Sequence, residues 1–234
     1  MRTAAVVLIF VASCECRSRP PKPVVTSTDS AAPAIKRTTP RTETRPTSPP
    51  SLPEAATAWT AAEKQNTAEA WDAAGDTYER ERQACTANCL DAAYAVILAR
   101  RNAIKAAPVK PPEGEEPAPL PPRVQDLVEA ADEYIKRTDA SDPDFVGLKF
   151  LAANALNQFR QPDAIERLEE LLREHRNEAN AEYAANMLLA SLARMGRIAE
   201  LKKWVAELLA DAAFLEGKPE LRQRLEMMTA QMTK

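Results

Sequence analysis

Cys85 and Cys89 are the pair of side chains whose type and spacing could do chemistry, because four residues span about one helical turn. The sequence predicts a helix over 84–106, so both thiols would lie on one side of it. Three interpretations remain open. The pair could close as a local disulfide in an oxidising compartment, or pack as two small apolar residues of the core. It could also be half of a soft-metal or redox site, although no nearby histidine, methionine or further cysteine completes the ligand set.

No other group of residues has a catalytic or cofactor-binding pattern. His175 is the only histidine, and its charged neighbours predict a solvated position near a helix end. The sequence contains no glycine-rich phosphate loop, no GxSxG, no HExxH and no CxxC. Glu169 and Glu170 lie between Arg167 and Arg173, a spacing that favours exposed ion pairs over acid–base catalysis. We therefore predict no catalytic residue, no metal, no cofactor and no small-molecule substrate, and a protein that is not an enzyme.

The elements that must position these residues are predicted to be helices. A hydrophobic content of 45%, five glycines and 5% aromatic residues are typical of helices rich in alanine and leucine. Stretches without internal proline predict helices at 55–64, 67–82, 84–106, 122–137, 144–160, 162–176, 179–195, 198–215 and 219–232. No run of alternating β-branched residues predicts a strand, so the expected fold class is all-α. The net charge of −3 gives no general affinity for nucleic acid.

Proline and charge divide the chain into a predicted tether and two helical blocks. Nine of the 19 prolines fall in residues 17–53 and seven in 108–122. Residues 17–53 hold seven basic and two acidic residues and few large apolar ones, which predicts a disordered basic tether rich in proline, threonine and serine. This leaves 54–234 with a net charge of −8. The predicted blocks are 54–107 and 122–234, joined by an acidic Pro-rich loop at 108–121.

The first residues have the pattern of a secretory signal. Arg2 precedes a short apolar run over 4–10 that cannot span a bilayer, and a Val-Ala-Ser tripeptide then leads into Cys14. This ending resembles the lipobox of bacterial lipoproteins. The resemblance implies removal of a signal peptide of residues 1–13 and acylation of the Cys14 sulfur, so that residues 14–53 join a lipid anchor to the helical part. It also implies the cell envelope, where Glu15 favours the outer membrane facing the periplasm. An ordinary secretory signal, cut after a small residue, is the alternative.

Apolar positions recur with a period of 37 residues in the second block. Leu127 aligns with Ala164 and Leu201, Ala131 with Leu168 and Val205, Tyr134 with Leu171 and Leu208, and Ile135 with Leu172 and Leu209. A fixed period of this length predicts stacked helical hairpins. The spacing of Trp71, Ala74, Gly75 and Tyr78 resembles the first-helix signature of the tetratricopeptide repeat, whose usual period is about 34 residues. The resemblance implies antiparallel hairpins stacked as an α–α superhelix; a non-repeating helical bundle is the alternative.

The tetratricopeptide resemblance implies a function in protein–protein docking. In that family the first helix of each pair usually lines the concave face, which here points to Lys149, Asn154, Tyr183 and Asn186 as a partner-binding groove. With the anchor and the tether, this predicts a non-enzymatic adaptor for protein partners in the envelope, in assembly, pilus, secretin or motility machinery. Two alternatives remain open: a cell-wall or surface-binding lipoprotein that uses its basic tether, and a thiol redox or metal protein that uses its cysteine pair.

Overall fold

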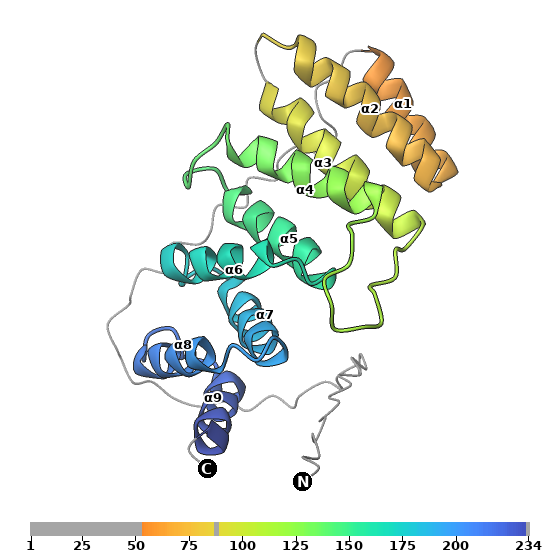
Figure 1. Ribbon diagram of the computed structural model, residues 1–234. Coiled ribbons are helices and arrows are strands. Elements are labelled where there is room, and N and C mark those ends of the chain that lie inside the picture. Colours follow the sequence, from red (N-terminus) through yellow and green to blue (C-terminus); the bar gives the residue numbers. More distant parts are fainter. Residues whose placement is uncertain (1–52, 87–88, 233–234) are drawn as a thin grey trace, which may run out of the picture. The chain divides into compact units, whose positions relative to one another are not determined.

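The computed structural model describes residues 53–86 and 89–232, and these residues form helices, turns and loops but no strand (Figure 1). The helices are α1 (Pro53–Gln65), α2 (Ala68–Ala84), α3 (Cys89–Ala106), α4 (Pro122–Ile135), α5 (Phe145–Gln158), α6 (Asp163–Glu174), α7 (Ala181–Arg194), α8 (Ile198–Ala210) and α9 (Pro219–Met232). The all-α prediction is therefore confirmed for the described residues. None of these helices combines the length and the hydropathy that a membrane span needs. The predicted signal peptide, Cys14 and nearly all of the tether lie outside the described residues.

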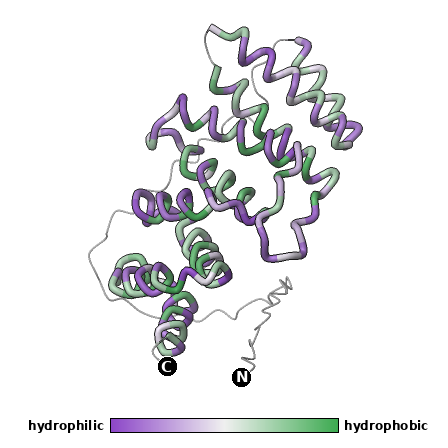
Figure 2. The backbone as a smooth tube through the Cα atoms, in the orientation of Figure 1, coloured by the Kyte–Doolittle hydropathy of each residue, from purple (hydrophilic) through white to green (hydrophobic). Residues whose placement is uncertain are grey.

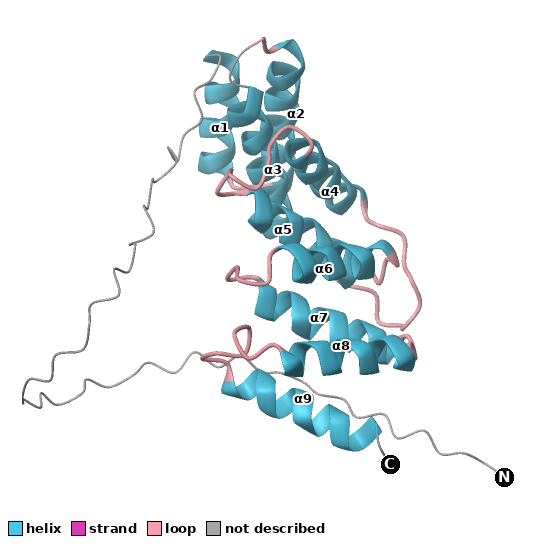
Figure 3. Cartoon of the chain, turned by 90° about the vertical axis from the view of Figure 1, so that its left-hand side faces the viewer, coloured by secondary structure: helices cyan, strands magenta, loops and turns pink. Residues whose placement is uncertain are grey.

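Each helix packs mainly against the helices next to it in sequence. From α1 to α9, consecutive helices contact one another, and α5 also contacts α7. Figure 1 and Figure 3 show the same order from two sides, with each helix beside its neighbours in the chain. Apolar and polar residues alternate along the helices (Figure 2), as expected when one stripe of each helix is buried. The core is thus built from contacts between consecutive helices.

Capping residues and glycines set most of the predicted helix boundaries. The Thr67 hydroxyl accepts a hydrogen bond from the backbone N–H of Ala70 and so caps α2. Gly196, just after α7, has a φ of +66°, the left-handed conformation that commonly ends a helix, whereas Gly217, with φ +73°, was predicted to end a helix but lies in the turn between α8 and α9. Pro219 begins α9, where its missing N–H costs no helical hydrogen bond. Each predicted helix is present in the described residues, with its ends within a few residues of the prediction except at two places.

The first exception lies between α2 and α3. The helix predicted over 84–106 begins only at Cys89, because α2 continues to Ala84 and then ends. Cys85, the residue after α2, has the extended backbone values φ −76° and ψ 133°. The prediction that both cysteines belong to one helix is therefore wrong, and no glycine or proline in this stretch marks the break.

The second exception is the end of α8. The helix predicted to reach residue 215 ends at Ala210. The side chain of Asp211 accepts a hydrogen bond from the backbone N–H of Phe214 at 2.9 Å. An aspartate that bonds a nearby backbone N–H in this way stabilises a turn and competes with the helix. This short-range bond accounts for the early end of α8.

Polar contacts between alternate helices recur at a nearly constant sequence separation. Three of these contacts join residues that are 35 apart in sequence: Asp132–Arg167 between α4 and α6, Glu169–Trp204 between α6 and α8, and Arg176–Asp211 between the residues that follow α6 and α8. A fourth contact, Asn157–Ser191 between α5 and α7, joins residues that are 34 apart. Equivalent contacts repeated at one offset are typical of a stack of similar units.

The apolar positions that align at a period of 37 residues are buried in the same way. Ten of these positions are at most 5% exposed, and they are Leu127, Ala131, Tyr134, Ala164, Leu168, Leu171, Leu172, Leu201, Val205 and Leu208. Ile135 and Leu209 are partly buried. The aligned stripe is therefore the core of α4, α6 and α8, while the finer tetratricopeptide-like superhelix stays a prediction.

The acidic loop at 108–121 connects α3 to α4 and is attached to the end of α5. The backbone N–H of Ala118 donates to the carbonyl oxygen of Phe159 at 3.1 Å. The side-chain amide of Gln161 donates back to the carbonyl oxygen of Ala118 at 2.6 Å. These two bonds fix one side of the loop, whereas Glu113, Glu115 and Glu116 remain exposed.

We predict that Leu188→Ala lowers the free energy of unfolding by about 3 kcal/mol, because Leu188 of α7 is fully buried and the substitution leaves a cavity. Urea unfolding followed by circular dichroism measures the change. Ile198→Ala is the matched control, since Ile198 of α8 is 46% exposed and its truncation should cost less than about 1 kcal/mol. Equal losses in the two variants would contradict the assigned core.

Candidate functional site

α5 and α7 lie side by side and carry all four residues predicted to form a partner-binding groove. In their N-terminal halves, the ring centroids of Phe150 and Tyr183 are 6.4 Å apart. Toward their C-terminal ends, the Ser191 hydroxyl donates to the side-chain oxygen of Asn157 at 2.6 Å. Contacts at both ends show that the two helices run in the same direction. The predicted residues are therefore held on adjacent, parallel elements.

Tyr183 is the most exposed of the large hydrophobic side chains among the described residues, with 65% of its surface accessible. Its ring packs against Phe150, while Val146 and Met187 beside them are partly buried against the core. We call the four side chains Val146, Phe150, Tyr183 and Met187 the aromatic face. Exposed aromatic side chains held by neighbours are typical of protein-binding surfaces, where such residues supply much of the binding energy.

Lys149 is engaged within the fold. Its ammonium group lies 2.6 Å from a carboxylate oxygen of Glu170 and 3.3 Å from one of Glu174, both on α6, and 5.0 Å from the ring centroid of Phe145. Burial is the largest influence on the pKa of Lys149 and lowers it, but the hydrogen bonds and charges of the two glutamates together raise it. Lys149 therefore joins α5 to α6.

The two predicted asparagines occupy different surroundings. Asn186 donates to the carbonyl oxygen of Glu182 at 3.1 Å and accepts a hydrogen bond from Arg224 of α9 at 2.5 Å. Asn154 lies one turn beyond Phe150 on α5, at a groove shared with α3 and α4, and its side-chain oxygen accepts a hydrogen bond from the amide of Gln158 at 3.5 Å. The structure thus places Tyr183 and Asn186 next to each other on α7, and Asn154 at a second surface.

Cys85 is the residue after α2, and Cys89 begins α3. Both are partly buried, and the structure draws no disulfide bond to either of them among the described residues. The Cys89 thiol donates to the carbonyl oxygen of Cys85, with sulfur and oxygen 3.3 Å apart. A disulfide between two residues of one helix would have to distort that helix. Cys85 lies outside α3, so a disulfide between Cys85 and Cys89 would not require this distortion. The disulfide stays a prediction.

His175 lies at the end of α6, as predicted, but the prediction that it is solvated is wrong. Only 13% of its side chain is exposed, and its ring packs edge-on against Phe145 with centroids 6.0 Å apart. Within residues 53–86 and 89–232, no group of three or more histidine, cysteine, aspartate or glutamate side chains could hold a metal ion. The imidazole thus serves as a packing group between α5 and α6.

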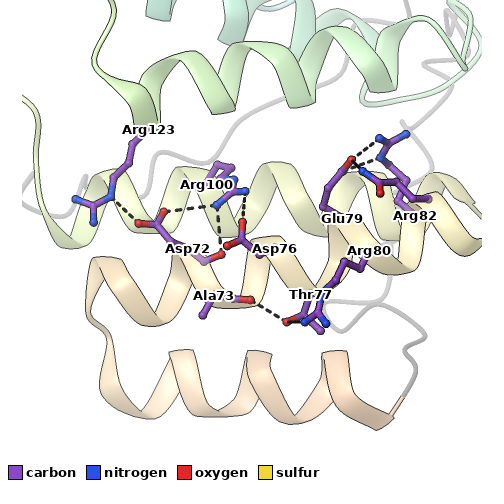
Figure 4. A network of polar contacts seen from close by, with 10 residues as sticks. Asp72, Ala73, Asp76, Thr77, Glu79, Arg80, Arg82, Arg100 and Arg123 are labelled. Carbon is purple, nitrogen blue, oxygen red and sulfur yellow. Dashed lines mark hydrogen bonds and ion pairs between the residues drawn. The ribbon is translucent and has the colours of Figure 1, made fainter.

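A network of arginines and carboxylates joins α2, α3 and α4 (Figure 4). Arg100 of α3 lies 2.6 Å from the carboxylate of Asp76 and 3.2 Å from the carbonyl oxygen of Asp72. Arg123 of α4 lies 2.8 Å from the carboxylate of Asp72 and 3.1 Å from that of Glu69. Asp72 and Arg123 are 51 residues apart in sequence, so no helical spacing could have revealed the pair. Asp72 thereby holds three consecutive helices together.

Gly75 makes room for the Arg100 side chain of this network. A Cβ atom at position 75 would lie 3.2 Å from the guanidinium carbon of Arg100, closer than ordinary van der Waals contact. The glycine of the tetratricopeptide-like signature therefore has a local explanation, which is the close approach of an arginine from α3 across the face of α2.

A cavity of about 210 Å³ lies beside the network, between α2, α3 and α4. Most of its charged side chains are paired, as Glu79 is with Arg82 and Glu133 with Lys136. Asp126 lines the same cavity. It is a partly buried carboxylate without a hydrogen-bonding or ion-pair partner among the described residues.

Several charges act on the Asp126 carboxyl. Burial is the main cause that raises its pKa, and the charge of Arg100 opposes this effect. The negative charges of Glu129, Asp72 and Asp76 raise the pKa further. Ionisation of Asp126 is therefore less favourable in the fold than in the unfolded chain.

Comparison with protein families, with characterised proteins and with solved structures finds no match to this chain. The candidate site accordingly depends on its geometry alone. That geometry offers one exposed aromatic face on α5 and α7, and a groove beside it at Asn154.

We predict that Asp126→Asn stabilises the fold in a pH-dependent way. A raised folded-state pKa means that stability is lost as the pH rises from the unfolded pKa through the folded pKa. Asparagine cannot ionise, so the advantage of the variant should grow as the pH rises from the unfolded pKa, about 3.9, through the folded pKa. Urea unfolding at several pH values measures it.

Asp139→Asn is the control of opposite sign. The hydroxyl and the backbone N–H of Ser141 donate to Asp139 and lower its pKa. Stability from this carboxylate is present above the unfolded pKa and is lost as the pH falls through the folded pKa, so the penalty of the variant should shrink in acid. The same pH trend in both variants would contradict the assigned environments.

Proposed function

We propose that this chain is a membrane-anchored, non-enzymatic adaptor that docks protein partners in the bacterial cell envelope. A diacylglyceryl group on Cys14 holds it to the membrane, with the outer membrane facing the periplasm as the preferred location. The basic tether separates the anchor from a tetratricopeptide-like helical stack, and the stack binds components of assembly, pilus, secretin or motility machinery. It acts without a cofactor and without binding nucleic acid.

The observation that carries this proposal is the exposed ring of Tyr183. The Tyr183 side chain is 65% exposed, so most of its apolar ring faces water in the free protein. The ring is nevertheless held against Phe150, on a helix whose opposite side is buried. A rigid aromatic side chain loses little conformational entropy on binding, which suits it to anchor a partner. Asn186 follows one turn later on α7 and supplies a polar group at the rim.

We predict that Tyr183→Ala reduces capture of partners from native membranes at least about fivefold, because truncation removes an aromatic anchor from the interface. The measurement is affinity capture with the full chain, followed by quantitative mass spectrometry. Ile198→Ala on α8 is the matched control, since it also removes an exposed apolar side chain. The thermal midpoint of both variants should stay within about 2 °C of the parent. Undiminished capture by Tyr183→Ala would remove the aromatic face from the proposal.

We predict that Cys14→Ser moves the protein from the membrane fraction to the soluble fraction, because a single serine cannot carry the acyl chains that bind the bilayer. Cell fractionation and the mass of the mature N-terminus measure the change. Cys16→Ser tests the same chemistry two residues away and should remain membrane-bound and acylated. Continued membrane association of Cys14→Ser would refute the proposed anchor.

A further inference from the structure

A groove over the C-terminal halves of α3 and α5 combines an apolar floor with a cationic rim. Its volume is about 170 Å³, and α4 contributes to its floor. We propose that this groove binds an acidic, leucine-containing segment of a partner protein. This proposal rests on the proposed docking function and specifies which kind of partner segment the groove would bind.

The floor of the groove is suited to an aliphatic side chain. Ile104 of α3 and Leu151 of α5 are partly buried beside Leu127 of α4, which is 5% exposed. The first two side chains therefore keep accessible apolar surface at the bottom of a concave site. A leucine placed there would remove that surface from water and gain contacts with three helices.

The rim of the groove carries two cations that have no counter-ion among the described residues. Arg101 and Lys105 stand one turn apart on α3, are exposed, and form no ion pair with a described residue. Their neighbour Arg100 points to α2 instead and is paired with Asp76. Unpaired cations beside an apolar floor attract carboxylates and select against neutral or basic segments. Asn154 on the opposite wall adds an amide that can donate to the same ligand.

Two further arginines at the same ends of α5 and α7 extend this cationic character. Arg160 follows α5 in the left-handed conformation, with φ +58°, and its Nε and Nη1 atoms are buried without a hydrogen-bond partner in the described residues. Arg194 near the end of α7 donates to the Ser191 hydroxyl at 3.2 Å. The side chain of Arg194 is exposed, and a carboxylate near it would form a strong, charge-assisted hydrogen bond.

Electrostatics agrees with this arrangement. Burial and the positive charge of Arg160 hold the pKa of Arg194 below its ordinary value. Glu115 of the acidic loop opposes the shift, but it is exposed and forms no ion pair with a described residue. Since 54–234 has a net charge of −8, the helical part as a whole repels nucleic acid and anionic bilayers. A local cationic rim inside an acidic domain favours a short acidic segment.

The test uses the purified full chain and a short peptide of glutamate and leucine, blocked at both ends and carrying a fluorophore. Fluorescence anisotropy should show saturable binding that weakens with salt. The double variant Arg101→Ser/Lys105→Ser should bind roughly tenfold more weakly, because it loses two charge-assisted contacts. Lys202→Ser/Lys203→Ser is the matched control: it removes two exposed lysines of α8 that also lack ion pairs, and it should bind like the parent.

Three further probes decide the ligand chemistry. Replacing glutamate by glutamine in the peptide should abolish binding, and polyglutamate without leucine should bind more weakly than the mixed peptide. Vesicles containing phosphatidylglycerol should not compete. The proposal is overturned if the parent does not bind the peptide, if both double variants bind equally, if the glutamine peptide binds as well, or if the vesicles are the better ligand. Should peptide binding fail while Tyr183-dependent capture persists, the docking function stands and only this inference falls.

Discussion

The burial of one apolar stripe per helix against its chain neighbours is the constraint on which the rest of this structure depends. Consecutive helices make nearly all of the helix-to-helix contacts in the described residues. A single hairpin of this kind cannot bury its own stripe, so each one needs the next to complete its core. This is why fully buried leucines such as Leu168, Leu188 and Leu208 recur along the stack. It also leaves one side of each helix free to meet solvent or a partner.

Much of the fold could be predicted because its local signals agree with its packing. Prolines and glycines mark most helix ends, and the 37-residue recurrence of apolar positions correctly identified the buried stripe. The predicted helix ends were wrong at the two places where no glycine or proline in the sequence marks the end of the helix. The sequence between Ala84 and Cys89 contains no glycine or proline, and the turn after Ala210 depends on the hydrogen bond between Asp211 and Phe214. Alanine-rich sequence favours helix on both sides of such turns, so propensity alone extends the helix across them.

The site was less predictable than the fold, because its character depends on contacts between distant parts of the sequence. Helical periodicity could place Lys149 and Tyr183 on the first helices of their pairs. It could not show which of the two side chains is exposed and which is engaged in contacts within the fold. Lys149 is paired with glutamates 21 and 25 residues away, whereas Tyr183 stays exposed. The network of Arg123 with Asp72 lies beyond local spacing for the same reason, since the Pro-rich loop lengthens the separation between α2 and α4. The exposure of a side chain, rather than its residue type, therefore distinguishes residues that stabilise this fold from residues that remain accessible to a partner.

Ion pairs between helices engage some charged side chains of the stack and leave others without a partner among the described residues. From α2 onward, the pairs that join one helix to another draw their carboxylates from α2, α4, α6 and α8 or its end, as in Asp72–Arg123, Asp132–Arg167 and Glu207–Arg176. Such pairs fix the spacing of the helices they join, and they also engage cations of odd-numbered helices, such as Arg100 of α3 and Lys149 of α5. Arg101 and Lys105 on α3 and Arg194 on α7 have no carboxylate partner among the described residues, because the neighbouring helix faces there are apolar or amide-bearing. Charges already paired within a fold contribute little to a new interface, whereas unpaired charges beside apolar surface can contribute both affinity and selectivity. Under the proposed docking function, the groove beside Arg101 and Lys105 is therefore suited to recognition, whereas the ion pairs between helices hold the stack together.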